Sequence, residues 1–121
     1  MTAARRLLTV VLALWSCWAW AHAFADRFEP RPRAVLRAAP AEVRIWFNGD
    51  LEPAFSTVAV TGPADQRVDR GDARVDPENR RLLRASLRPL VPGIYRVTWR
   101  VLAVDGHRTQ GSYRFTLKAP E

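Results

Sequence analysis

The sequence predicts an all-β domain, either a Greek-key β-barrel or an immunoglobulin-like β-sandwich of about seven strands, preceded by a cleaved signal peptide. Several short segments alternate polar and apolar residues with the period of a half-buried strand. Pro and Gly separate these segments at intervals of about 8 to 12 residues, which is typical of antiparallel sandwiches and small barrels. No stretch of about 10 to 12 residues carries the apolar stripe of a helix.

The strongest strand predictions are segments 42–47 and 95–101, where polar and apolar residues alternate. One side of each segment is expected to pack in the core, with Tyr95 and Trp99 on the inward side of the second. Weaker candidates have a similar composition and a shorter alternation. They are residues 24–28, 57–60, 73–75, 82–87 and 113–117.

Turns are expected wherever Pro or Gly stands between two candidate strands, because these residues favour turn conformations. The spacing leaves no internal repeat, linker or low-complexity segment, so functional side chains are expected on loops or at strand ends. The predicted turns are residues 30–32, 48–50, 62–63, 76–77, 91–93 and 105–106.

The N-terminus has the three parts of a secretory signal. Two arginines precede an uncharged run from Leu7 to Trp20, and a small-x-small cleavage motif ends at Ala21. The uncharged run is shorter than the roughly 20 residues that a membrane-spanning helix needs. We therefore expect residues 1–21 to be removed on export, leaving one domain of residues 22–121.

Two other interpretations of this segment stay open. Residues 14–17 loosely match a lipobox, which would leave a lipidated Cys17 as the first residue, although Trp15 fits that motif poorly. The segment could also be a buried N-terminal helix, but it has neither an amphipathic period nor a cap. Cys17 is the single cysteine, so a domain that begins at residue 22 has no disulfide and no thiolate metal site.

The charge of the predicted domain is moderate. Of 19 basic residues, Arg5 and Arg6 belong to the signal, so 17 remain against 12 acidic residues, a net charge of +5. The arginines are scattered along candidate strands and do not gather into a nucleic-acid-binding motif. A solvated basic face is expected, with Arg100 and Arg108 placed to steer an acidic partner.

The two histidines of the sequence are candidate metal ligands. If cleavage follows Ala21, His22 offers both an imidazole and an α-amino group, whose reference pKa of about 7.7 to 8.0 lets a metal displace its proton at neutral pH. Residues two apart in an extended segment point to the same side, so Asp105 and His107 are expected to converge, with Gly106 leaving the approach open. One amine, two imidazoles and one carboxylate favour a single tetragonal Cu(II) ion.

Simpler interpretations exist for the same residues. Asp-Gly is a strong hairpin signal, so residues 105–106 could form only a tight turn. His22 could be an ordinary chain terminus. Trp46 and Trp99 are interpreted as packing residues on strands.

Segments spread over the whole predicted domain resemble the CopC copper-resistance family of exported copper-binding domains. The most specific part runs from Leu90 to Phe115, where a PL-x-x-G-x-Y-x-V-x-W-R-V run precedes D-G-H-x-x-x-G. The residues that carry the resemblance are His22-Ala23, 39–47, Leu51, 87–101, 105–107, Gly111, Tyr113 and Phe115.

The resemblance implies a periplasmic, non-enzymatic protein that binds one Cu(II) through His22, Asp105 and His107. It further implies a buffer or carrier for copper resistance or homeostasis that delivers copper to a CopD-like inner-membrane transport protein. A monomer that does not bind nucleic acid is expected. The chain departs from the family in three ways: Asp50 stands near the position of an auxiliary Glu, the domain has no methionine for a Cu(I) site, and Ala103 and Val104 replace a Ser-rich pair before Asp105.

Two rival functions are compatible with the same residues. An N-terminal histidine with a second histidine also resembles the copper brace of oxidative polysaccharide monooxygenases, although this chain is small for a broad substrate surface. The other rival is a structural β-sandwich without a metal site, in which Asp105-Gly106-His107 is only a turn.

Overall fold

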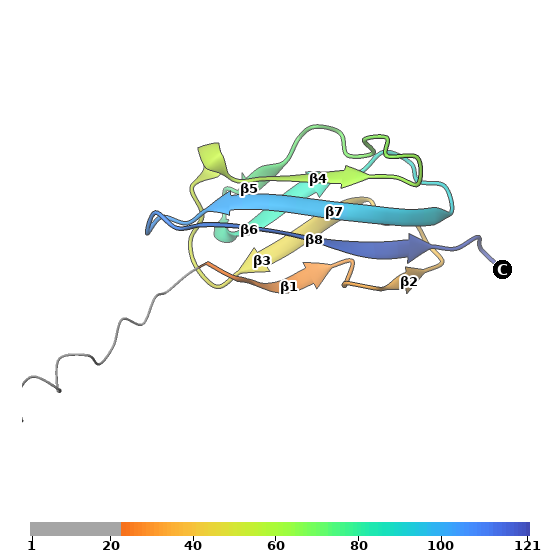
Figure 1. The fold of residues 1–121 in the computed structure, drawn as a ribbon, viewed down its shortest axis with the longest axis horizontal. Coiled ribbons are helices and arrows are strands. Elements are labelled where there is room, and N and C mark those ends of the chain that lie inside the picture. Colours follow the sequence, from red (N-terminus) through yellow and green to blue (C-terminus); the bar gives the residue numbers. More distant parts are fainter. Residues whose placement is uncertain (1–22) are drawn as a thin grey trace, which may run out of the picture.

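The computed structural model describes residues 23–121, which form two four-stranded β-sheets packed face to face (Figure 1). The strand order is β1-β3-β6-β5 in one sheet and β2-β8-β7-β4 in the other. Most consecutive strands cross from one sheet to the other, which is Greek-key connectivity and confirms the sandwich form of the predicted fold. The strands are β1 (Ala25–Glu29), β2 (Val35–Leu36), β3 (Glu42–Phe47), β4 (Thr57–Thr61), β5 (Arg74–Asp76), β6 (Asn79–Ser86), β7 (Gly93–Leu102) and β8 (Arg108–Leu117).

All seven predicted strands are present, and the short β2 is an addition. β2 pairs in parallel with the end of β8 and has only two residues, too few for any alternation to reveal. β8 begins at Arg108, five residues before the predicted start, because β7 and β8 form one continuous hairpin from Gly93↔Leu117 to Leu102↔Arg108. Backbone hydrogen bonds hold its polar half in place whatever the side chains are.

The core lies between the sheets and is built from the alternating residues of the central strands. Val43, Ile45 and Phe47 of β3 are buried, and Glu42, Arg44 and Trp46 between them are not. On β7 the inward side holds Tyr95, Val97 and Val101, as predicted. Burying an aliphatic or aromatic side chain of this size contributes about 1.5 to 3 kcal/mol, so these strands hold the sheets together.

The two domain tryptophans have different environments. Trp99 packs edge-on against Phe47, with ring centroids 5.5 Å apart, which confirms its interpretation as a packing residue. Trp46 points the other way, to the outer surface of its sheet, where the guanidinium carbon of Arg27 lies 4.3 Å from the centre of its ring. Trp46 therefore packs under arginine side chains on the outer surface and not in the core, because its place in the alternation is the outward one.

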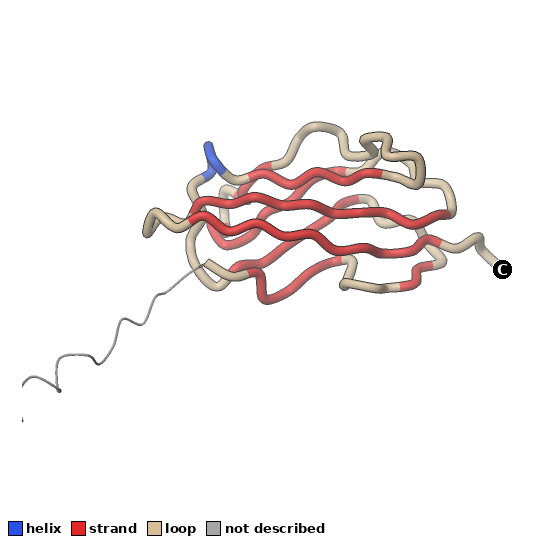
Figure 2. The backbone as a smooth tube through the Cα atoms, in the orientation of Figure 1, coloured by secondary structure: helices blue, strands red, loops and turns tan. Residues whose placement is uncertain are grey.

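Helical structure in residues 23–121 is limited to one short 3-10 turn, η3 (Pro53–Phe55), as Figure 2 shows. No helix in this part of the chain is both long and apolar enough to cross a membrane. Figure 1 shows that η3, the β7–β8 turn and the start of β1 share one end of the sandwich, opposite the C-terminus. That end carries the candidate site.

Candidate metal site

The β7–β8 turn holds two of the three predicted ligands. The Ala103 N–H donates to the His107 carbonyl and the Gly106 N–H to the Ala103 carbonyl, each at 2.9 Å. Gly106 has φ of 94°, and a Cβ added there would meet no atom within 4 Å. A side chain would have room at this position. Glycine is therefore favoured by the positive φ of the backbone and not by crowding. The expectation of an extended segment is wrong, and the tight turn is confirmed.

Asp105 and His107 converge because of this turn. The Asp105 Oδ1 atom accepts the His107 backbone N–H at 3.0 Å and lies 3.2 Å from His107 Nδ1. The two side chains are 36% and 37% exposed, although the His107 Nδ1 atom itself is buried. The predicted convergence is present, although an Asx-type contact across the turn produces it.

The chain that leads into β1 is held against the same end of the sandwich. Ala23 is buried, and its carbonyl accepts a hydrogen bond of 3.2 Å from the Thr109 hydroxyl on β8. The Phe24 N–H donates to Asn48 Oδ1 at 2.7 Å, and the Asn48 N–H returns a bond to the Phe24 carbonyl at 2.9 Å. Residues 23–24 are thereby fixed between β8 and the turn after β3.

Sequence reasoning missed these supporting residues. Asn48 was interpreted only as part of a turn, although the oxygen of its side-chain amide can accept a hydrogen bond from a distant backbone N–H. Gly49 lies directly against Ala23, since a Cβ there would be 3.4 Å from Ala23 Cβ, a van der Waals contact. Thr109 gave no signal, since a threonine on a strand is ordinary.

Asp50 does not join Asp105 and His107. Its Oδ1 atom lies 3.2 Å from Arg81 Nε, and its carbonyl accepts the Val104 N–H at 3.1 Å. Within residues 23–121 no group of three metal-ligating side chains is present. His22 and the predicted signal, residues 1–21, lie outside the described residues, so the described part of the site consists of Asp105 and His107.

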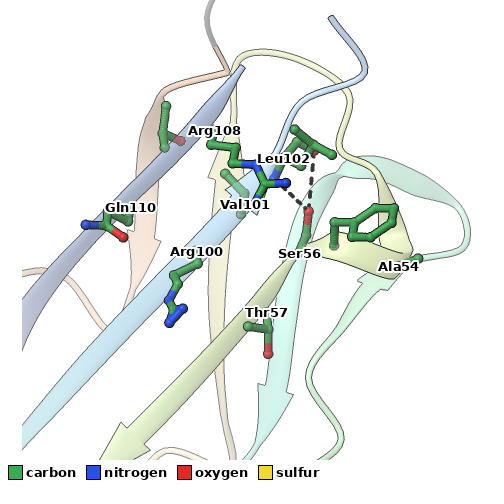
Figure 3. Close-up of a pocket in the computed structure, with 10 residues that line it drawn as sticks. Ala54, Ser56, Thr57, Arg100, Val101, Leu102, Arg108 and Gln110 are labelled. Atoms are coloured by element: carbon green, nitrogen blue, oxygen red, sulfur yellow. Dashed lines mark hydrogen bonds between the residues drawn. The ribbon is translucent and has the colours of Figure 1, made fainter. Parts of the chain in front are cut away.

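A hollow of about 590 Å³ opens beside this end of the sandwich, between η3 and the β7–β8 hairpin (Figure 3). Arg100 and Arg108 both line it, and the Leu102 N–H donates to Ser56 Oγ at its wall, at 3.3 Å. Guanidinium groups bind anions and cannot ligate a metal cation. The lining residues are Ala54, Phe55, Ser56, Thr57, Arg100, Val101, Leu102, Arg108, Thr109 and Gln110.

Comparison with known proteins gives a consistent assignment. The family model described as the CopC domain matches residues 26–118. Protein YobA of Escherichia coli strain K12 is 35% identical over 100 residues, covering 82% of this chain and 81% of YobA. Copper resistance protein C of Xanthomonas campestris pv. juglandis is 27% identical over 95% of this chain and 94% of its own length. Copper transport protein CutJ of Bacillus subtilis is 29% identical over 81% of this chain but only 18% of CutJ.

Two solved structures share the fold. CopC from Methylosinus trichosporium OB3b superposes with a TM-score of 0.73 at 30% identity, covering 83% of this chain and 97% of that one. PcoC from Escherichia coli, described as a methionine-rich copper resistance protein, gives a TM-score of 0.66 at 28% identity, covering 81% of this chain and all of PcoC. In contrast to that description, this sequence has a single methionine, Met1.

Proposed function

The chain belongs to the CopC family, and from this premise we propose that it is an exported protein that binds one Cu(II) ion as cargo. Its ligands would be the α-amino group and imidazole of His22, the Asp105 carboxylate and the His107 imidazole. The observation that carries the proposal is the hydrogen bond from Thr109 to the Ala23 carbonyl. It ties the residue after His22 to the strand that begins next to His107.

Covalent geometry supports the shared site. Adjacent Cα atoms across a trans peptide are about 3.8 Å apart, so residue 22 cannot lie far from the fixed backbone of Ala23. Asp105 Oδ1 and His107 Nδ1 are 3.2 Å apart, close enough for one ion to reach both side chains. The described residues supply only two ligands of this kind together, so a complete site needs a further donor.

The donor set selects the oxidation state. Amine, imidazole and carboxylate ligands suit Cu(II), whereas Cu(I) prefers thiolate and thioether sulfur. The predicted domain lacks cysteine and methionine, since Cys17 and Met1 both lie in the predicted signal. The Asp50 carboxylate, paired with Arg81, is not part of the proposed set.

The proposed role is to buffer or carry copper in the periplasm as a monomer, for copper resistance or homeostasis, and to deliver it to a CopD-like inner-membrane transporter. Relatives named for copper resistance and copper transport support it. Cleavage after Ala21 would then release the domain and create the amine ligand in one step. We propose no catalytic step for the protein.

A Cu(II) competition titration with a chelator tests the amine ligand. Protein beginning at His22 is compared with the same protein carrying one extra alanine before His22. We expect the extension to weaken binding at least about tenfold, because it turns the His22 amine into a peptide amide and so removes a nitrogen ligand that shares one residue with the imidazole. Asp105→Asn should also weaken binding, whereas Asp50→Asn, the matched carboxylate control, should leave it unchanged.

Equal affinity of the native and extended proteins would contradict the proposed amine ligand. Absence of tight Cu(II) binding in protein that begins at His22 would support the structural sandwich. Reductant- and oxygen-dependent cleavage of a polysaccharide by the copper-loaded protein would identify an oxidative enzyme and overturn the carrier role.

A further inference from the structure

We propose that the outer face of the β2-β8-β7-β4 sheet docks an extended acidic segment of a partner protein. Four exposed arginines stand on it, and we call them the arginine face: Arg96 and Arg100 on β7, and Arg108 and Arg114 on β8. Among residues 23–121, none of the four takes part in an ion pair.

The strands of this face carry no acid at their outward positions. The antiparallel register sets Arg96 opposite Arg114, and like charges directly opposite destabilise a sheet. Carboxylates brought by a partner would relieve this repulsion. The outward residues are Thr57, Ala59 and Thr61 of β4, Ile94, Arg96, Thr98, Arg100 and Leu102 of β7, and Arg108, Gln110, Ser112, Arg114 and Thr116 of β8.

Three hollows follow one another along the face. The hollow beside η3, of about 590 Å³, shares Arg100 and Gln110 with a central hollow of about 320 Å³. The central hollow shares Arg96 with a third, of about 310 Å³. At about 3.3 Å per residue, the eight steps from Ile94 to Leu102 span roughly 26 Å, the length of an extended segment of about eight residues.

The side chains of the arginine face are suited to binding carboxylates. Arginine binds planar carboxylates through two parallel hydrogen bonds, and the four cations of this face are all arginines. Thr98 and Ser112 lie opposite each other at its centre and offer hydroxyls to a backbone or side chain. In an extended chain, side chains on one face repeat about every 6.6 to 6.8 Å, the same repeat as the outward residues of β7.

A protein segment fits this face better than a membrane surface. Exposed apolar side chains lie only near its ends, Phe55 at 65%, Ile94 at 55% and Val35 of the edge strand β2 at 57% exposure, and the polar middle offers nothing to insert into lipid. At the far end, Asp65 lines the third hollow and makes no ion pair among residues 23–121, so the acidic segment would end before it.

Docking of an acidic segment on the arginine face does not require copper. Arg108 directly follows His107, so a docked segment would end beside the proposed copper ligands without contacting the metal. The test is therefore made on metal-free protein, so that its outcome separates from that of the copper titration.

The probe is a fluorescently labelled peptide, acetyl-(Glu-Thr)4-amide, added to metal-free protein that begins at His22. We expect binding in low salt, amide NMR shifts along β7 and β8, and loss of affinity in about 0.5 M NaCl. The double variant R96Q/R100Q should weaken binding by roughly tenfold, since it removes two charge-assisted contacts. The second double variant, R108Q/R114Q, should behave in the same way.

R31Q/R88Q is the matched control, because it removes the same charge from exposed arginines that make no ion pair within residues 23–121. It should change affinity less than about twofold if position matters more than net charge. Equal weakening by all three double variants, or equal binding of acetyl-(Gln-Thr)4-amide, would overturn the proposal. So would preferential binding to phosphatidylglycerol vesicles over the peptide, because the face would then serve a lipid surface.

Discussion

The outer faces of the two sheets carry arginines in similar positions but pair them differently. On the β1-β3-β6-β5 sheet, Arg44 and Arg74 lie in register on either side of Arg84, a row of three cations. Acids stand between and beside them, whereas the arginine face has none at its outward positions. Equivalent placement of arginines on strands therefore has opposite consequences in the two sheets.

The pairs of the first face are close. Arg84 donates to Glu42 and to Asp76 at 2.8 Å each. The Glu29 carboxylate oxygens lie 2.7 Å from a guanidinium nitrogen of Arg27 and 2.5 Å from one of Arg44. Both guanidinium groups lie over the Trp46 ring. The charged side chains around Arg84 are therefore paired within the molecule, whereas the arginine face makes no ion pair within residues 23–121.

The largest effect is expected from Asp69, whose side chain is fully buried beneath the edge of the second sheet. Burial alone would raise the pKa of this carboxyl, but hydrogen bonds from Arg67, Val60 and Gly71 outweigh it and hold the pKa below its usual range. Asp69→Ala leaves two backbone N–H groups without this acceptor and should lower the free energy of unfolding by about 2 to 4 kcal/mol.

Urea denaturation measures this change, with Asp26→Ala, an exposed acid outside any ion pair of residues 23–121, as control. A loss no larger than that of the control would show that the second sheet does not depend on this internal acid.

The next largest expected effect is a difference in stability between an arginine variant of the first sheet and one of the second. Arg84→Met keeps the stem of a half-buried side chain and removes its bonds to Glu42 and Asp76, so stability should fall by about 1 to 2 kcal/mol. Arg96→Met removes a cation that faces another arginine and should change stability by less than about 0.5 kcal/mol. Thermal or urea unfolding of both variants makes the comparison. Equal losses would contradict the distinction between a paired and an unpaired face.

Acid should act through Asp69 and also through the paired face. The backbone N–H of Glu78 and the side chain of Arg84 lower the pKa of Asp76, and the side chain of Arg27 is the main cause of the lowered pKa of Glu29. A carboxyl with a depressed folded-state pKa contributes its full stability above the unfolded-state value of about 4, and loses it as pH falls through the folded-state value.

Stability should therefore fall as pH drops below about 4, and Asp76→Asn should flatten this fall. Denaturation midpoints measured between pH 2 and 6 test it, and Asp26→Asn should keep the native slope. An unchanged slope in Asp76→Asn would mean that this carboxyl does not contribute to acid sensitivity.

The smallest effect concerns the unpaired face and its dependence on salt. Arg96→Gln should stabilise the protein slightly at low ionic strength, by less than about 0.5 kcal/mol, because it removes the repulsion from Arg114. The gain should vanish in about 0.5 M NaCl, where screening acts over only a few ångströms. A destabilisation that is independent of salt would indicate an internal partner for Arg96.

Much of the fold was predictable from local pattern. Alternation in segments 42–47 and 95–101 placed the core residues of β3 and β7 correctly, since side chains alternate across any strand. The same alternation places Trp46 outward, beside Glu42 and Arg44, as the structure shows. β2 was beyond prediction because its pairing is set by β8, not by its own two residues.

The candidate site divides in the same way. Local sequence indicated Asp105 and His107 and the glycine between them, because a hairpin turn is a short-range structure. The hydrogen bonds from Thr109 to Ala23 and from Phe24 to Asn48 join residues 86 and 24 positions apart, and no local pattern encodes such separations. His22 remains a prediction of the sequence and of its family.

The sequence by itself determined an all-β domain of about seven strands, the approach of Asp105 to His107 and the absence of sulfur ligands from the predicted domain, because alternation, short spacing and composition act locally. The choice between barrel and sandwich, and the turn that brings Asp105 to His107, came from the tertiary structure. Only the tertiary structure decided which arginines form ion pairs with acidic side chains. Arg84 and Arg96 look alike as single arginines on strands. Sheet pairing brings Glu42 and Asp76 to the first, and sets Arg114 opposite the second, because the register joins residues far apart in the chain.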